Sequence, residues 1–196
     1  MSSVSRSAVG PGTDPVARMT EDELIIRLMF TINHLSRWLT PVHDDLRLRR
    51  SPQREIPSVK DLLLRMRDHE LDVFPQLYAI ANSDRPDLDL LQRYSRTEAE
   101  RAWDRSAAVL SVMSEVRRLR QSTGSLLRSL PNDAWRRDGL SRSHGDTTIR
   151  RLADELARHD AEVLGEMDRS LKISGARQGI STASKASLEE LMELPV

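Results

Sequence analysis

The chain has 196 residues, of which 38% are hydrophobic and 31% charged, and its 30 basic and 30 acidic residues give a formal net charge of zero. This balance argues against a nucleic-acid-binding protein, because such proteins carry a basic excess or a basic stripe. The sequence contains no cysteine, which excludes disulfides, thiolate metal sites and a cysteine nucleophile. No apolar run approaches the roughly 20 residues that cross a bilayer, and the N-terminus lacks the apolar stretch of a signal peptide. We therefore expect a cytoplasmic protein without membrane contact.

The N-terminal part predicts a tail followed by a helix. Residues 1–18 are rich in serine, glycine and proline, and they cannot bury enough apolar surface to offset their ordering entropy. Thr20 is followed three residues later by Glu23, which is the spacing of a helix-capping box. The helix should continue to about Leu39, just before Pro41. Its apolar residues recur at helical spacing: Leu24, Leu28, Ile32, Leu35 and Leu39.

A polar connection with three prolines, residues 41–57, leads to a second helix. Ser58 is its expected N-cap, with Asp61 at the capping-box position. Pro75 lies inside the helical pattern, so we expect a kink or a local break there. Residues 82–87 indicate a loop. The inner stripe of this helix contains Val59, Leu62, Met66, Val73, Leu77 and Ile80.

A third long helix is predicted over about residues 96–130, with Gly124 as a point of interruption and Pro131 as its stop. Residues 137–145 then read as a loop. The apolar set of this helix is Trp103, Leu110, Met113, Val116, Leu119, Leu126, Leu127 and Leu130.

Thr147 or Thr148 caps a fourth helix, after which the composition shifts at Ser174 to small and polar residues. A short helical stretch, Leu188–Leu194, is expected near the end of the chain. The inner face of the fourth helix is regular: Ile149, Leu152, Leu156, His159, Val163, Met167 and Leu171.

Four amphipathic helices without a strand pattern predict an all-α protein, an antiparallel four-helix bundle. The bundle should span residues 19–173, between flexible tails at 1–18 and 174–196. The C-terminal tail would carry the short helix.

His159 is the most informative polar residue, because it occupies a core-phase position on the fourth helix. A buried imidazole needs partners, since an unsatisfied buried polar group costs about 1–3 kcal/mol. Two interpretations stay open. His159 is either a metal ligand or acid/base group in the bundle core, or a hydrogen-bonded structural histidine.

Two further residues sit on one face of the second helix. Arg65 and His69 are four residues apart, so an inward orientation would make a cationic patch suited to a carboxylate or phosphate. An outward orientation would make them solvated surface. On the fourth helix, Glu162 follows His159 at the spacing of histidine and carboxylate ligands in bundle metal sites, although in reversed order and in a single copy.

Three segments resemble the DinB/YfiT-like four-helix-bundle family. They are the run from Ser58 to Glu70, the stretch from Leu126 through Trp135 to Arg137, and Gly145–Ile149 followed by Leu152 and His159. Their order and spacing agree with the family over about residues 19–172. The resemblance implies a divalent metal held by three histidines, one from the second helix and two from a His-x-x-x-His pair on the last. It also implies metal-dependent hydrolysis or transfer chemistry on a low-molecular-weight thiol, and pairing as homodimers.

The sequence departs from the family pattern at two of these three positions. Arg65 stands at the second-helix ligand position, and Val163 stands where the partner of His159 is expected. A guanidinium is permanently cationic and cannot ligate a metal ion under ordinary conditions.

The leading hypothesis is therefore a DinB-like bundle with a degenerate metal site and no cofactor, whose cleft holds Arg65, His69 and His159 and binds a small anionic ligand or thiol. One alternative is a metal-dependent hydrolase or thiol-dependent S-transferase. It would use a rebuilt site of His159, His69 and Glu162 with one nickel, zinc, manganese or iron ion. Another is an interaction protein that forms homodimers. A third possibility is that Arg65 pairs with a carboxylate, Asp61 or Asp68 being within reach, and replaces the metal as a structural tie.

Overall fold

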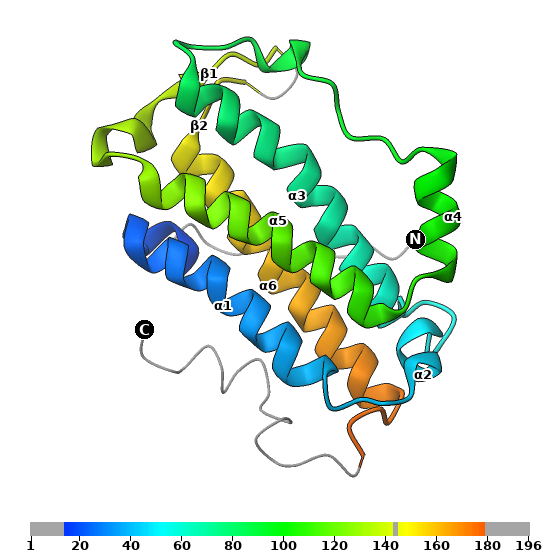
Figure 1. The fold of residues 1–196 in the computed structure, drawn as a ribbon. Helices are drawn as coiled ribbons and strands as arrows, with labels where there is room; N and C mark the ends of the chain where they lie inside the picture. The colour runs from blue at the N-terminus through cyan, green and yellow to red at the C-terminus, as the bar shows by residue number, and fades with distance from the viewer. Residues whose placement is uncertain (1–13, 143–144, 179–196) are drawn as a thin grey trace, which may run out of the picture.

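The structure, a computed structural model, describes residues 14–142 and 145–178 and confirms the helical bundle (Figure 1). Four long helices, α1, α3, α5 and α6, form the bundle, and short elements connect them. In chain order the elements are η1 (Val16–Arg18), α1 (Glu21–Leu39), α2 (Asp45–Arg49), α3 (Val59–Asn82), η2 (Leu88–Leu90), α4 (Glu98–Ser106), α5 (Val109–Ser129), η3 (Asn132–Arg136), β1 (Asp138–Gly139), β2 (Thr147–Thr148) and α6 (Ile149–Ile173).

The predicted helix starts are confirmed. The Thr20 hydroxyl accepts the backbone N–H of Glu23 at 3.3 Å, and the Glu23 carboxylate accepts the backbone N–H of Thr20 at 2.7 Å. Ser58 and Asp61 form the same reciprocal pair at the start of α3. These bonds satisfy backbone donors that the first helical turn leaves without a partner. At α6 the cap is Thr148.

The prediction of one helix over residues 96–130 is wrong, because α4 and α5 are separate. Ala107 and Ala108 have extended backbone between them, with ψ of 140° and 150°. The Ala107 carbonyl, which the break frees from helical bonding, accepts a hydrogen bond from Lys60 Nζ at 2.6 Å. Trp103 and Leu110, expected in the core, are exposed on either side of this break.

Other local expectations also change. Helix α3 continues through Pro75 and helix α5 continues through Gly124, so neither residue ends its helix. The connection 41–57 contains the short helix α2. No strand was predicted, but two two-residue strands, β1 and β2, form one antiparallel pair between α5 and α6. The predicted helix Leu188–Leu194 lies outside the described residues.

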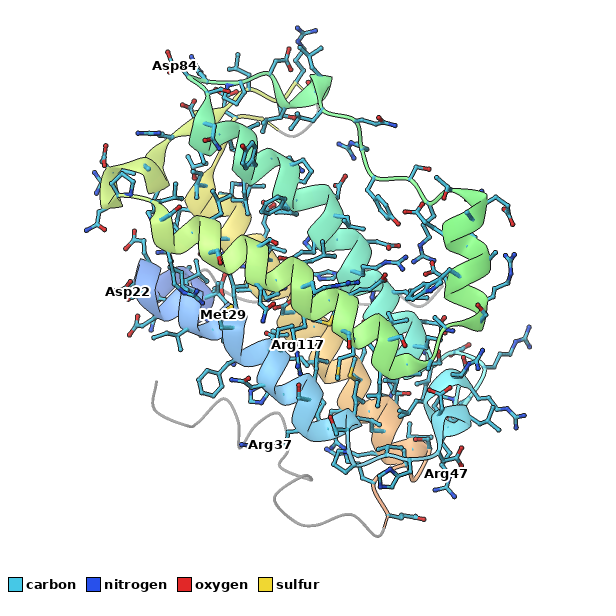
Figure 2. The ribbon with its side chains drawn as sticks, viewed as in Figure 1. Asp22, Met29, Arg37, Arg47, Asp84 and Arg117 are labelled. Carbon is cyan, nitrogen blue, oxygen red and sulfur yellow. The ribbon has the colours of Figure 1, made fainter. Side chains whose placement is uncertain are left out.

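The helices run in two directions, and α3 and α5 share one of them (Figure 1). Helix α3 packs against α5 and α6, and α1 packs against the same two helices. Since α3 and α5 are parallel, the chain must travel back along the bundle between them, and residues 83–108 do so outside α3 (Figure 1). Asp84, just after α3, and Arg47, on α2, lie near opposite ends of the bundle (Figure 2). This crossover is what positions the clefts described below.

The apolar core is divided into two clusters along the bundle axis. One holds Leu35, Leu62 and Val112, and the other holds Leu24, Leu77 and Leu152, all almost fully buried. Both clusters receive residues from α1, α3, α5 and α6. The helical segments between them contribute a layer of charged side chains.

Arg120 of α5 is the centre of this charged layer and is 1% exposed. Its Nε and Nη2 donate to Glu70 Oε2 on α3 at 2.9 and 2.7 Å. Its Nη1 and Nη2 donate to Asp160 on α6 at 2.5 and 3.0 Å, and Nη1 also donates to the Leu28 carbonyl of α1 at 3.0 Å. The guanidinium that α5 contributes is therefore bonded to each of the other three bundle helices.

The charges of this layer balance. Burial by itself would lower the pKa of Arg120, but Asp160 and Glu70 raise it above its ordinary value. Arg27 of α1, 8% exposed, adds a second cation close enough to Asp160 to interact with it electrostatically. Two cations thus face two carboxylates, which is the condition under which buried charge is tolerated.

Arg120→Met should lower the free energy of unfolding by about 3–5 kcal/mol, because it leaves two carboxylates buried without their partner. Urea denaturation followed by circular dichroism measures this loss. Arg118→Met, on the exposed face of α5, is the matched control and should change stability by no more than about 0.5 kcal/mol. Equal effects of the two substitutions would contradict the central role of Arg120.

Candidate functional site

The structure brings two of the candidate residues into contact. The imidazole rings of His69, on α3, and His159, on α6, have centroids 4.0 Å apart and planes inclined at 35°. The helices that carry them are direct neighbours in the bundle. Sequence reasoning named both residues but contained no signal for their distance, which depends on how α3 and α6 dock.

One ring nitrogen of each histidine is buried and lacks a partner. His69 Nε2 and His159 Nδ1 make no hydrogen bond to any described residue. An imidazole nitrogen that loses water without gaining a partner costs about 1–3 kcal/mol. Two such atoms lie on neighbouring rings, and both rings belong to residues that line one cleft.

Burial also keeps both rings uncharged. It lowers the pKa of His159 to about 4, and the nearby His69, Arg65 and Arg120 add to the shift while Asp160 opposes it. The pKa of His69 is lowered as well, mainly by burial, against the attraction of Asp160, Glu70 and other carboxylates. At neutral pH each ring therefore has one nitrogen without a proton, able to accept a hydrogen bond.

The histidine pair lies where two clefts meet. The first, which we call the α3–α6 cleft, has a volume of about 500 Å³. The second, the hairpin cleft, has a volume of about 230 Å³ and lies between α3, the η2 segment and the start of α6. His69 and Asp72 line both clefts. Thr147, whose buried Oγ1 has no partner among the described residues, lines the hairpin cleft. The α3–α6 cleft is lined by Asp61, Leu64, Arg65, Asp68, His69, Asp72, Arg96 and His159.

Arg65 lies on the same face of α3 as His69, as its spacing predicts, and it lines the α3–α6 cleft. Its carboxylate partner is Glu166 of α6, with Nη2 and Oε2 2.5 Å apart, and not the same-helix residues Asp61 or Asp68. The two side chains are 46% and 42% exposed. An exposed ion pair contributes about 0–1 kcal/mol, so this one is a weak tie between α3 and α6 and leaves the guanidinium available to a ligand.

The residues present do not fit a three-ligand metal centre. Glu162 is exposed and does not line the cleft, and Val163 is buried in the apolar core. Within residues 14–142 and 145–178, no group of three histidine, aspartate or glutamate side chains is placed to hold a metal ion. Glu162 is therefore not placed as a third ligand beside His69 and His159.

Three charged residues next to the site were missed by sequence reasoning. Glu70, Arg120 and Asp160 each stand at a core-phase position among apolar residues of their helices. Their position in the apolar stripe was the signal that the sequence offered for a buried ion cluster, since a charge in a buried stripe requires a partner of opposite charge. On the fourth helix we predicted that His159 is the core residue, but the neighbouring Asp160 is the more buried of the two.

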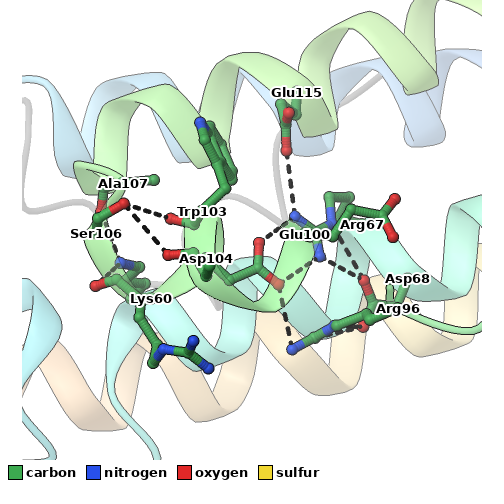
Figure 3. Close-up of polar contacts among 12 residues, drawn as sticks. Lys60, Arg67, Asp68, Arg96, Glu100, Trp103, Asp104, Ser106, Ala107 and Glu115 are labelled. Carbon is green, nitrogen blue, oxygen red and sulfur yellow. Dashed lines mark hydrogen bonds and ion pairs between the residues drawn. The ribbon is translucent and has the colours of Figure 1, made fainter. Parts of the chain in front are cut away.

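The outer wall of the site is fastened by a second set of ion pairs (Figure 3). Arg67 of α3 and Asp104 of α4, each 5% exposed, form two hydrogen bonds, of 2.5 and 2.9 Å. Arg96 pairs with Asp68 of α3 and with Asp104. Together with the bond from Lys60 to the Ala107 carbonyl, these contacts hold the crossover segment against α3. The site therefore has a fixed wall.

The fold can now be compared with those of known proteins. No family model and no curated protein matches the sequence. A solved structure does match, with a TM-score of 0.65 over 88% of this chain and 94% of the other, at 14% sequence identity. It is YfiT from Bacillus subtilis, described as a probable metal-dependent hydrolase with an unusual four-helix bundle topology. The chain has the fold of YfiT.

The YfiT fold confirms the bundle type that the sequence resemblance predicts. At this level of identity the likeness concerns the fold alone. None of the helices in the described part of the chain is long and apolar enough to cross a membrane.

Acidification between pH 6.5 and about 4 should destabilise the protein through its buried histidines. Burial lowers the pKa of His34 to about 4, as it does for His159. Over this range the unfolded chain takes up protons that the folded chain does not, so the free energy of unfolding falls as the pH falls. His159→Gln should show a smaller fall, measured by urea denaturation at several pH values.

The exposed His43 provides the control, because His43→Gln should follow the wild type across the whole range. A pH dependence of His159→Gln that coincides with the wild type would mean that His159 is protonated equally in the two states.

Proposed function

We propose that this protein binds a small ligand in the α3–α6 cleft, with an anionic group of the ligand on Arg65 and a polar group against His69 and His159. The observation that carries the proposal is that two contacting imidazoles, with ring centroids 4.0 Å apart, each have a buried nitrogen without a partner among the described residues. Ligand sites commonly combine a concave surface with a few convergent polar groups, and this cleft has that composition.

Arg65 is the group best suited to the anionic end of the ligand. Its only hydrogen bond among the described residues is to Glu166, although a guanidinium has five N–H donors. Carboxylates and phosphates are the anions whose geometry matches these donors. The ligand would add to the Glu166 contact or replace it, at little cost because that ion pair is exposed.

The two histidines favour a ligand with a donor group at the other end. A neutral imidazole nitrogen accepts from S–H, O–H or N–H groups. A low-molecular-weight thiol with a carboxylate would satisfy both ends of the cleft, as would a hydroxy acid or an amino acid.

The alternative is a metal-dependent hydrolase or thiol-dependent S-transferase, which the likeness to YfiT and the approach of two imidazoles favour. It requires ligands beyond the two histidines, and the described residues do not provide a third. An interaction protein that forms homodimers stays a prediction, and the predicted helix Leu188–Leu194 lies outside the described residues.

Metal analysis separates these two functions. Protein purified without an affinity tag and dialysed should contain no stoichiometric nickel, zinc, manganese or iron by plasma mass spectrometry. About one ion per chain in the wild type, lost in His159→Ala, would overturn the binding proposal in favour of the metal enzyme.

Arg65→Ala should weaken the binding of small anions by about tenfold, because it removes a charge-assisted contact. Hexanoate and inorganic phosphate are suitable probes, followed by isothermal titration calorimetry. Arg85→Ala is the control, since Arg85 is an equally exposed arginine held by Asp138 and Asp146 away from the cleft. Affinities that are the same in the wild type and in Arg65→Ala would rule out an anion on Arg65.

A further inference from the structure

Asp72 is a further polar residue of the site whose side chain has no partner among the described residues. It lies on α3 one turn after His69, is half-buried, and lines both clefts. Its carboxylate makes no hydrogen bond or ion pair with any residue that the structure describes, whereas the other acidic residues of the α3–α6 cleft, Asp61 and Asp68, are bonded. The Asp72 carboxylate is therefore free to accept hydrogen bonds from a ligand in the cleft.

Neither cation that lines the α3–α6 cleft pairs with Asp72. Arg65 contacts Glu166, and Arg96 contacts Asp68 and Asp104. The electrostatic influence of Asp72 reaches His69, where it opposes the lowering of the imidazole pKa by burial. The protein thus leaves an unmatched negative charge beside two unmatched imidazole nitrogens.

The three unsatisfied groups share one chemical character. The Asp72 carboxylate only accepts hydrogen bonds, and the unprotonated nitrogen of a neutral imidazole also only accepts. His69, His159 and Asp72 all line the same cleft, with His69 and Asp72 one helical turn apart on one face of α3. The lining of this cleft therefore includes a carboxylate and two neutral imidazoles, all of which can accept hydrogen bonds.

We infer that the group that binds among these side chains is a primary ammonium, and that the ligand of the proposed site is an elongated zwitterion. An alkylammonium carries only N–H donors, which suits a cleft lined by a carboxylate without a partner and two neutral imidazoles. Its charge is opposite to that of Asp72, so the bond to the carboxylate is charge-assisted.

The position of Arg65 sets the length of this ligand, an argument that rests on the proposed function. Arg65 and Asp72 are seven residues apart on one face of α3, which corresponds to roughly 10 Å along the helix axis. The ammonium and carboxylate of an α-amino acid are adjacent and cannot reach both residues. An ω-amino acid, or a short peptide bound through its amino and carboxyl ends, can span this distance.

Three matched probes test the inference: 6-aminohexanoate, hexylamine and hexanoate, which carry both charges, the cation alone and the anion alone. Titration calorimetry on the full-length protein gives the affinities, and NMR of the histidine side chains reports whether the imidazoles take part. We expect 6-aminohexanoate to bind at least tenfold more tightly than hexanoate and to shift the imidazole signals of His69 and His159.

Asp72→Asn is the decisive variant, because it keeps the shape of the side chain and removes its charge. It should weaken 6-aminohexanoate and hexylamine by about tenfold or more and leave hexanoate unchanged or slightly tighter. Asp84→Asn, on an exposed aspartate at the end of α3, is the matched control and should bind all three probes like the wild type (Figure 2). Thermal unfolding verifies that both variants are folded.

The possible failures can be told apart. If hexanoate binds through Arg65 but Asp72→Asn does not change the affinities of the two amines, the anion site is supported and the ammonium inference is wrong. If none of the probes binds to the folded wild type, both proposals are overturned. Stoichiometric metal on the histidine pair would also overturn the ammonium inference, because the metal ion would then occupy the position inferred for the ammonium group.

Discussion

The rest of this structure depends on the guanidinium of Arg120, which one bundle helix contributes and the other three bind. Apolar packing alone is tolerant of sliding, since a helix can move by a turn and still bury leucines against leucines. A buried cation bonded to Glu70, Asp160 and the Leu28 carbonyl does not tolerate such a move, because every displaced bond leaves a charged or polar group unsatisfied. The charged layer between the two apolar clusters thus sets the register of the bundle.

The candidate site inherits its geometry from this layer. Glu70 directly follows His69, and Asp160 directly follows His159. Successive residues of a helix point about 100° apart, so the carboxylate of each pair enters the core while the imidazole points toward the cleft. By holding Glu70 and Asp160 on one guanidinium, Arg120 also holds the two imidazoles at their separation of 4.0 Å. The surface pair of Arg65 and Glu166 lies outside this layer and is a weaker, replaceable contact between the same two helices.

The sequence predicts the helices well and the site only in part, for identifiable reasons. Capping boxes and apolar spacing are local patterns, so the starts at Thr20 and Ser58 and the buried stripes of α1, α3 and α6 follow from them. The break at Ala107 carries no glycine or proline and depends on a long-range bond from Lys60, which no local pattern reveals. Likewise, helical phase marks His69 and Arg65 as sharing a face, but the partner of Arg65 and the approach of His159 depend on how α6 docks. The core position of Arg120 was visible in the phase of α5, yet its three partners lie on other helices.

The bonds of Arg120 also bear on how the bundle forms in time. Its partners lie 92, 50 and 40 residues away along the chain, so no helical hairpin can make these bonds on its own. Until the last helix docks, the guanidinium lacks part of its bonds, so a partly assembled bundle leaves charged groups of the layer without their partners. The desolvation of the layer is then completed in a single late step, which couples the two apolar clusters into one cooperative unit and disfavours half-folded states in which only one of them is packed.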